Sequence, residues 1–161
     1  MSDVLEKPKD TTALRDLAGI DQLRAVFAGK TAWKGIGATL DFKAVQIEEG
    51  FVVFEGQPTE AVYNPIGTVH GGYAATLLDS AVGCAVHSML KPGQGYTTME
   101  LKVAYHRAMT TESGPVRAEG RVTSLGRRAA FAEGKLFDAK GRLCASATST
   151  LLVFSAEKAA A

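Results

Sequence analysis

The first candidate for chemistry is Asp79, the one acid within an otherwise apolar run from Gly72 to Met89. Residues four apart stack on one face of a helix, so the neighbours of Asp79 on that face are Ala75 and Gly83. Such small neighbours leave room beside the carboxylate for a substrate or a water, and no Lys or Arg lies between Asp79 and Met89. Two interpretations fit this pattern: a catalytic carboxylate, or an ordinary acid at the wet edge of a buried helix.

A glycine pair, Gly71 and Gly72, stands where this helix should begin. The first N–H groups of a helix lack intrahelical partners and lie at the positive end of the helix dipole. Because glycine has no side chain, a ligand oxygen can approach these donors closely, which is the arrangement that stabilises an oxyanion. The alternative is a pair that only forms a tight turn. For the preceding His70 we favour a ring that donates to a backbone carbonyl and fixes the turn over a catalytic base.

One helix cannot bring both groups to the same atom. Gly71 and Asp79 are eight residues apart, which is about 12 Å along a helix that rises ~1.5 Å per residue. A base or nucleophile must come within roughly 3–3.5 Å of the reacting atom. If both groups are catalytic, Asp79 must therefore come from a second copy of the chain, and we expect a homodimer with shared sites.

The element that positions Asp79 is a helix from Gly72 to about Met89. Apolar residues recur there at steps of three and four, as in a helix packed on a core: Ala74, Leu77, Leu78, Ala81, Val82, Ala85, Val86 and Met89. The helix should end at Lys91-Pro92-Gly93, which supplies a basic last turn and two helix breakers.

Strand patterns lie on both sides of this helix. Before it, Ile36 to Ile47 and Phe51 to Glu55 are expected to form a hairpin. After it come four strand candidates with turn-forming connectors: Tyr96 to His106, Pro115 to Ser124, Arg128 to Phe137 and Leu143 to Phe154. Successive strands with short connections pair antiparallel. We therefore expect an α+β fold in which one curved antiparallel sheet wraps around one long central helix.

The ends of the chain are expected to lie outside this domain. Thr11 to Ala28 is predicted to be helical in two pieces around Gly19, with Asp21 as a helix N-cap. We divide the chain into a partly helical N-terminal extension (1–35), the main domain (36–154) and a disordered tail (155–161).

The composition excludes several classes of partner. The chain has 161 residues, 46% hydrophobic and 22% charged, as expected for one globular domain. A net charge of +1 gives no strong attraction to nucleic acid or to an anionic membrane. No apolar run approaches the roughly 20 residues of a membrane span, and the polar N-terminus is no signal peptide. Cys84 and Cys144 lack metal-ligand spacing and suit a reducing compartment, so we expect a cytoplasmic protein without a metal.

The central motif is Asn64-Pro65-x-Gly67-x-x-His70-Gly71-Gly72, with an acid nine residues after the histidine. In this order it resembles the acyl-CoA thioesterases of the phenylacetate-degradation (PaaI-like) family, which have the hotdog fold. The likeness covers about Ile36 to Phe154 and includes later landmarks at Thr98–Leu101, Tyr105–Arg107, Gly126–Arg128 and Asp138–Ala145.

The resemblance implies a role for each residue of the motif. Asp79 is the general base for water or a nucleophile. The Gly71 amide polarises the thioester carbonyl, helped by the Asn64 side chain, and Thr98 helps to hold the attacking water. His70 belongs to the motif and shapes its turn. No cofactor is implied, since coenzyme A arrives as part of the substrate.

The resemblance also implies an assembly. Asn64 and Gly71 of one subunit face Asp79 and Thr98 of the other, and two such dimers join as a homotetramer. This agrees with the distance between Gly71 and Asp79, which requires a second chain without reference to any family.

The substrate is expected to be an aryl- or medium-chain acyl-CoA. Arg127 and Arg128 follow a glycine at a turn and could grip the phosphates of coenzyme A, and Tyr63 could line the acyl pocket. Gly72 and Gly83 complete the predicted binding residues. Three alternatives to a thioesterase are a non-catalytic acyl-CoA sensor, a hotdog hydratase or dehydratase, and a purely structural dimer.

Overall fold

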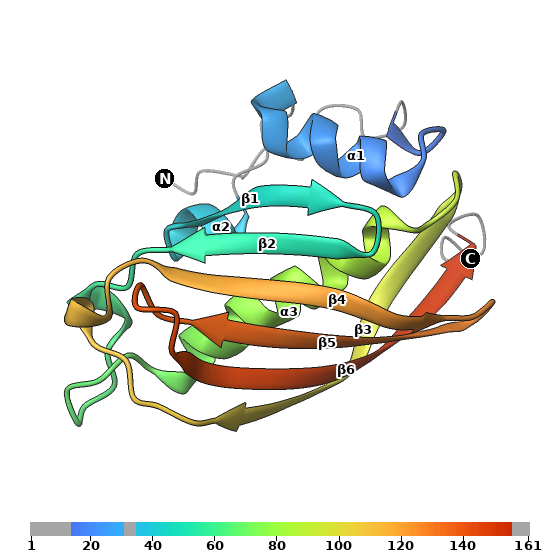
Figure 1. The fold of residues 1–161 in the computed structure, drawn as a ribbon. Helices are drawn as coiled ribbons and strands as arrows, with labels where there is room; N and C mark the ends of the chain where they lie inside the picture. The colour runs from blue at the N-terminus through green and yellow to red at the C-terminus, as the bar shows by residue number, and fades with distance from the viewer. Residues whose placement is uncertain (1–13, 31–34, 156–161) are drawn as a thin grey trace, which may run out of the picture.

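A single curved sheet wraps around one long helix in the computed structural model, which describes residues 14–30 and 35–155 (Figure 1). The helix is α3 (Gly71–Ser88). The sheet order is β1-β2-β4-β5-β6-β3, and every neighbouring pair is antiparallel. The strands are β1 (Phe42–Glu48), β2 (Phe51–Gly56), β3 (Gln94–Tyr105), β4 (Val116–Leu125), β5 (Ala129–Phe137) and β6 (Leu143–Ser155). The predicted fold class is confirmed.

The core lies between α3 and the concave face of the sheet. Leu77 and Leu78 of α3 are fully buried, as the helical spacing predicts. Gly120 of β4 allows the helix to come very close, because a Cβ atom there would overlap the backbone of Ala81 and Val82. This close contact lies just after Asp79 on α3 and leaves the helix little room to shift against the sheet.

The N-terminal part of the domain differs from the prediction. The short helices there are α1 (Gly19–Ala25), η2 (Val26–Lys30) and α2 (Ile36–Thr39). The expected strand from Ile36 to Ile47 is wrong in its first part: α2 occupies it, and Asp41 turns the chain with a positive φ of 52° before β1 begins. Asp21 is not an N-cap, because α1 begins after Ala18 and contains Asp21. Residues 1–13 of the predicted extension and 156–161 of the predicted tail lie outside the described residues.

Strand β3 contains a β-bulge where its pairing with β6 shifts register. Thr98 pairs with Leu151 and Glu100 pairs with Thr150, so Met99 is the extra residue, and its side chain is 65% exposed. The partly buried side chains therefore change parity along the strand: Tyr96 and Thr98 before the bulge, Leu101 and Val103 after it. The bulge places Thr98 on the same face of the sheet as the core residue Leu101.

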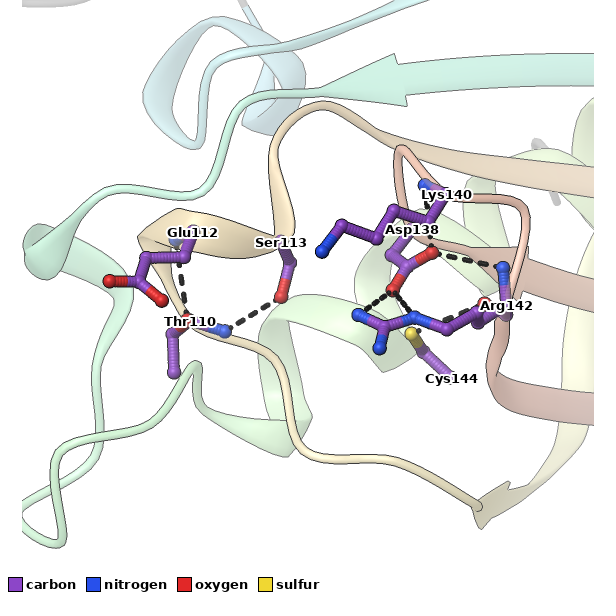
Figure 2. A network of polar contacts seen from close by, with 7 residues as sticks. All are labelled: Thr110, Glu112, Ser113, Asp138, Lys140, Arg142 and Cys144. Atoms are coloured by element: carbon purple, nitrogen blue, oxygen red, sulfur yellow. Dashed lines mark hydrogen bonds and ion pairs between the residues drawn. The ribbon is translucent and has the colours of Figure 1, made fainter.

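The turn between β5 and β6 is closed by a buried acid, Asp138 (Figure 2). Its carboxylate accepts hydrogen bonds from the backbone N–H groups of Lys140 and Arg142, and the Arg142 guanidinium lies 2.7 Å from Oδ2. The hydrogen bonds from the Arg142 side chain lower the pKa of Asp138; burial opposes this, and the two backbone N–H groups reinforce it. The Ala139 N–H also donates to the Ser113 carbonyl at 3.0 Å. Asp138 therefore stabilises the turn whose Ala139 N–H bonds to η4 (Thr111–Ser113).

Asp138→Asn should destabilise the fold at pH 7 and much less at pH 2. A folded-state pKa below the unfolded value of about 3.9 stabilises the fold at higher pH, and this stabilisation is lost as the pH falls through the folded pKa. The midpoint of urea unfolding, measured at both pH values, checks this. Glu133→Gln, a change of an exposed acid on β5, serves as the control. An equal loss at both pH values would show that the Arg142 interaction is not the cause.

Candidate active site

Asp79 lies near the middle of α3 and is partly buried. The hydroxyl of Thr98, on β3, donates a hydrogen bond to Asp79 Oδ1 at 3.0 Å. The ion pairs found within residues 14–30 and 35–155 do not include Asp79. Its charge is therefore held by a neutral hydroxyl and not cancelled by a cation, as expected for a carboxylate that must accept a proton.

A cavity of about 440 Å³ opens beside Asp79, and we call it the Asp79 cavity. Asp79, Ser80 and Cys84 of α3 form one side, and Tyr96 of β3 lies next to them. The other walls come from the sheet and from the N-terminal helices and are mainly apolar: Phe42, Phe54, Val26, Phe27 and Ile36, with Lys43 of β1 as the one basic residue of the lining. An apolar space with a few polar groups at one end is typical of a small-molecule site.

Two other ionisable groups in this cavity stay neutral at pH 7. Burial, reinforced by the nearby Asp79 charge, raises the pKa of the Cys84 thiol to about 12. Burial likewise raises the pKa of Tyr96, with smaller contributions from Cys84 and Asp79. Since the thiolate is the reactive form of cysteine, Cys84 is not an activated nucleophile. Of the groups discussed here, Asp79 is the one suited to accept a proton.

The space beside Gly83 is filled by Tyr96. A Cβ atom at Gly83 would lie 2.7 Å from the Tyr96 hydroxyl oxygen, so the missing side chain makes room for this ring. The prediction that Gly83 leaves an open space for substrate on this face is therefore wrong. Local spacing could not reveal this contact, because Tyr96 lies on a strand that follows the helix. Tyr96 is a lining residue that the sequence analysis missed.

At the beginning of α3, one of the two expected donors is already used. His70 is the N-cap of the helix, and its Nδ1 accepts a hydrogen bond from the Gly72 N–H at 2.8 Å. The His70 ring therefore stabilises the turn through Nδ1 as an acceptor. The prediction that the ring donates to a backbone carbonyl is wrong. Within the described residues, the Gly71 N–H has no hydrogen-bond partner. Gly71 is thus the candidate oxyanion donor, and Gly72 supports the turn.

Tyr105 packs over Gly71 and was missed as a site residue. Its hydroxyl donates to the Gly71 carbonyl at 2.9 Å, and a Cβ atom at position 71 would lie 3.0 Å from its ring. Glycine at position 71 thus permits this close approach, because a Cβ atom there would require the Tyr105 ring to shift. Gly71 and Tyr105 line a second cavity of about 350 Å³, together with Val69, Ala74 and residues 106–109. We call it the Gly71 cavity.

Asn64 and Tyr63 are held by local contacts. The Asn64 Oδ1 accepts from the Ile66 and Thr68 N–H groups at 3.2 Å, and its Nδ2 donates to the Thr68 hydroxyl at 2.9 Å. These bonds stabilise the loop before His70 and leave one N–H of the amide for a ligand. The Tyr63 hydroxyl accepts from the Thr111 N–H at 2.7 Å. Tyr63 lines neither the Asp79 cavity nor the Gly71 cavity.

Arg127 and Arg128 lie in the exposed turn between β4 and β5. No salt bridge in the described part of the chain involves either side chain. Neither arginine lines the Asp79 cavity or the Gly71 cavity. Their predicted contact with coenzyme A stays a prediction.

Within one chain the predicted site is divided into two parts. The Asp79 cavity contains the carboxylate next to Thr98, and the Gly71 cavity contains the helix N-terminus, with no lining residue in common. This is the separation that the spacing along one helix requires. One chain thus carries an acid at one position and an oxyanion donor at another.

Comparisons with known proteins identify the family. The family model described as the thioesterase superfamily matches residues 66–145. A proofreading thioesterase, EntH, of Klebsiella pneumoniae is 33% identical over 99 residues, covering 62% of this chain and 71% of the relative. The chain belongs to the thioesterase superfamily. The thioesterase is therefore a hydrolase of thioesters, and the predicted family is confirmed.

Two further proteins, one compared by sequence and one by structure, are similar to this thioesterase. A 1,4-dihydroxy-2-naphthoyl-CoA hydrolase of Listeria monocytogenes is 26% identical over 119 residues, covering 74% of this chain and 95% of the relative. A phenylacetic acid degradation-related protein of Ralstonia eutropha superposes with a TM-score of 0.74 at 25% identity, covering 81% of this chain and 98% of that one. These similarities support the PaaI-like type of hotdog thioesterase.

The described residues lack both a metal-ligand cluster and a membrane-spanning helix. They contain no group of three or more His, Cys, Asp or Glu residues that could hold a metal ion. None of the helices in residues 14–30 and 35–155 is long and apolar enough to cross a membrane.

Proposed function

We propose that the thioesterase hydrolyses aryl- or medium-chain acyl-CoA with Asp79 as the base or nucleophile and the Gly71 N–H as the oxyanion donor. The observation that carries this proposal is the carboxylate of Asp79, which is oriented by Thr98 at the edge of an apolar cavity of about 440 Å³. A cavity of this kind accepts an acyl group and places the thioester carbonyl next to the acid.

The chemistry follows from these groups. As a base, Asp79 takes a proton from a water that the Thr98 hydroxyl helps to hold, and the water oxygen attacks the thioester carbon. The negative charge that develops on the carbonyl oxygen is stabilised by the Gly71 N–H of a second chain. The carbon–sulfur bond then breaks, and the coenzyme A thiolate receives the proton from Asp79. As a nucleophile, Asp79 attacks the carbon itself, the carbon–sulfur bond breaks, and the coenzyme A thiolate departs while an anhydride remains on Asp79. Water then hydrolyses the anhydride to the free acid and the Asp79 carboxylate, and the proton released in this step balances the thiolate. A thioester is already activated, so neither route requires a cofactor.

The geometry of β3 supports sharing of the site between two chains. Thr98, next to Asp79, and Tyr105, hydrogen-bonded to Gly71, lie seven residues apart on this strand. One edge of β3 pairs with β6, and the sheet order gives its other edge no partner strand in the described part of the chain. A strand edge of 12 residues presents unpaired backbone groups that a second copy could pair.

Antiparallel pairing of two β3 strands would bring the half-sites together. A two-fold axis near Leu101 and Lys102 places Thr98 of one chain opposite Tyr105 of the other. The Asp79 corner of each subunit then faces the Gly71 corner of its partner, so the dimer has two complete sites. In this arrangement the free N–H of the Asn64 amide assists Gly71, and His70 keeps the turn in shape.

The remaining parts of the proposal concern the substrate and the assembly. The aromatic walls of the Asp79 cavity, Phe42 and Phe54, and the naphthoyl substrate in the name of the Listeria relative support an aryl or similarly bulky acyl group. Arg127 and Arg128 would bind the phosphates of coenzyme A from an exposed turn. Two dimers would join as a tetramer, in the cytoplasm.

The proposal predicts release of coenzyme A from benzoyl- or hexanoyl-CoA with a kcat/KM at least about 10-fold above that for acetyl-CoA. In an apolar pocket each additional small apolar group changes kcat/KM by roughly 10–200-fold. A thiol-reactive dye measures the release, and hydrolysis of a thioester without the nucleotide serves as the control. Binding of acyl-CoA, seen as a raised melting temperature, without turnover of any acyl-CoA would contradict the proposal and favour a sensor.

A further inference from the structure

The Asp79 cavity is walled in part by residues that precede β1. Residues 14–30 and 35–40, which we call the N-terminal segment, contribute Val26 and Phe27 from η2 and Ile36 and Ala38 from α2. Phe27 is 41% exposed and Ile36 is 56% exposed. Two large apolar side chains that line one cavity and are partly exposed form an apolar outer end of that cavity, and exposed apolar surface at a cavity can mark a ligand site.

Phe27 is the outer end of a row of three aromatic rings. Its ring packs edge-to-face against Phe54, with 5.5 Å between the ring centroids, and Phe54 packs against Phe42 at 5.7 Å. Phe54 and Phe42 are buried in the core. Because the buried rings hold it in place, Phe27 is a positioned part of the wall.

The same segment is anchored to the helix that carries Asp79. The Gly19 N–H donates to the Leu90 carbonyl at 2.9 Å, and a Cβ atom at Gly19 would overlap the His87 carbonyl. Gln22 forms a hydrogen bond with the His87 ring at 3.2 Å, and Leu23 is buried. α3 thus carries both Asp79 and His87, the residue that contacts α1, so the N-terminal segment is attached to the helix that holds the carboxylate.

We infer that Phe27 determines the length of the acyl group that the thioesterase accepts. The thioester lies at the Asp79 end of the cavity, and the acyl chain extends along the aromatic row toward Phe27, which closes the far end. The volume of about 440 Å³ lies within the range of roughly 300–1,000 Å³ for small-molecule sites. This inference rests on the proposed function, because it takes the Asp79 cavity as the acyl site.

The test compares Phe27→Ala and Phe27→Trp with wild type on straight-chain acyl-CoAs from acetyl to dodecanoyl. For Phe27→Ala, we expect the ratio of kcat/KM for decanoyl-CoA to that for hexanoyl-CoA to rise at least about 10-fold, since the cavity gains the volume of a ring. Phe27→Trp should lower the same ratio. Leu17→Ala is the matched control, because Leu17 is 39% exposed on the same segment and lines no part of the cavity.

Asp79→Asn, assayed in parallel, separates the two proposals. If Asp79→Asn is inactive and both Phe27 variants keep the wild-type chain-length profile, the inference about Phe27 is overturned and the proposed site remains. If Asp79→Asn retains full activity, the proposed site itself is wrong. The melting temperature of each variant is measured, and if Phe27→Ala does not fold, the direction of the Phe27→Trp shift decides the question.

Discussion

Asp79→Asn is expected to lower kcat for acyl-CoA hydrolysis by about 10²–10⁴-fold, the contribution of a positioned general base. Asparagine has the shape of aspartate, and its amide oxygen can still accept the hydrogen bond from Thr98. It cannot take a proton from water, so the loss should appear in kcat while KM changes little. Steady-state thiol release from the best substrate of the acyl-CoA panel measures both constants.

Asp16→Asn is the control for this substitution, because Asp16 is exposed and lines neither cavity. It should leave kcat at the wild-type value. Size-exclusion elution and the melting temperature must match wild type for both variants, so that a loss of activity reports on the chemistry. Activity of Asp79→Asn within a few-fold of wild type, with the fold intact, would remove Asp79 from the mechanism.

A single turnover in ¹⁸O-labelled water distinguishes the two roles that remain open for Asp79. Attack by water activated by a base places the label in the product acid alone. Attack by the carboxylate forms an anhydride, and its hydrolysis at the carbonyl of Asp79 leaves one labelled oxygen on that residue. Mass spectrometry of the peptide that contains Asp79 reads this difference directly.

The second large effect is expected for hybrids of two inactive chains. In a purified heterodimer of Asp79→Asn and Gly71→Pro, one site combines the intact Gly71 of the first chain with the intact Asp79 of the second. Its activity should be about half that of the wild-type dimer, because two-fold symmetry gives two sites of which one is complete. Each parent homodimer should be at least about 10²-fold less active than wild type. Co-expression with two affinity tags provides the heterodimer.

Gly71→Pro is chosen because it removes the N–H and no intrahelical bond. Position 71 is the first residue of α3, where proline is well tolerated. His70 has φ −62° and ψ 136°, which is the conformation that a residue before proline favours. Gly71→Ala is the matched control: it introduces the same contact with Tyr105 and keeps the N–H. A larger loss with proline than with alanine therefore measures the donor itself.

The reciprocal heterodimer makes the test decisive. When one chain carries both substitutions and its partner is wild type, shared sites each contain one defect and the heterodimer should be inactive. If each chain carried its own complete site, the results would be reversed: this heterodimer would keep half of the activity, and the first one would have none. That reversed result would contradict the arrangement proposed for β3.

Local pattern was sufficient for the elements that form the core. The steps of three and four from Ala74 to Met89 predicted α3, and alternation with turn residues predicted the strands after it. It failed at Ile36–Thr39, where a helix of a single turn is too short to show a period. The left-handed conformation of Asp41, which separates this turn from β1, has no distinct signal in the sequence.

Local pattern predicted even less of the candidate site than of the fold. Asp79 and Gly71 stood out because their residue types are unusual at those places. Their partners did not stand out from local spacing, because Thr98 and Tyr105 are distant in sequence and meet them only through the folded sheet. Thr98 was predicted through the family resemblance alone, and Tyr105 was missed. The use of the Gly72 N–H by His70 was also hidden, since glycine spacing does not show whether a donor is free.

The bulge at Met99 determines which insertions and deletions the thioesterase can tolerate. Side chains alternate along a strand, so a regular β3 would put Thr98 and Leu101 on opposite faces. Deletion of one residue here would turn one part of the strand to the other face. Either the Thr98 hydroxyl would no longer lie beside Asp79, or Leu101 and Val103 would lose their apolar contacts in the core. The register of this strand therefore affects both the hydroxyl beside Asp79 and the packing of the core. Homologous sequences should keep the spacing between Thr98 and Leu101 even where the residue at the bulge varies.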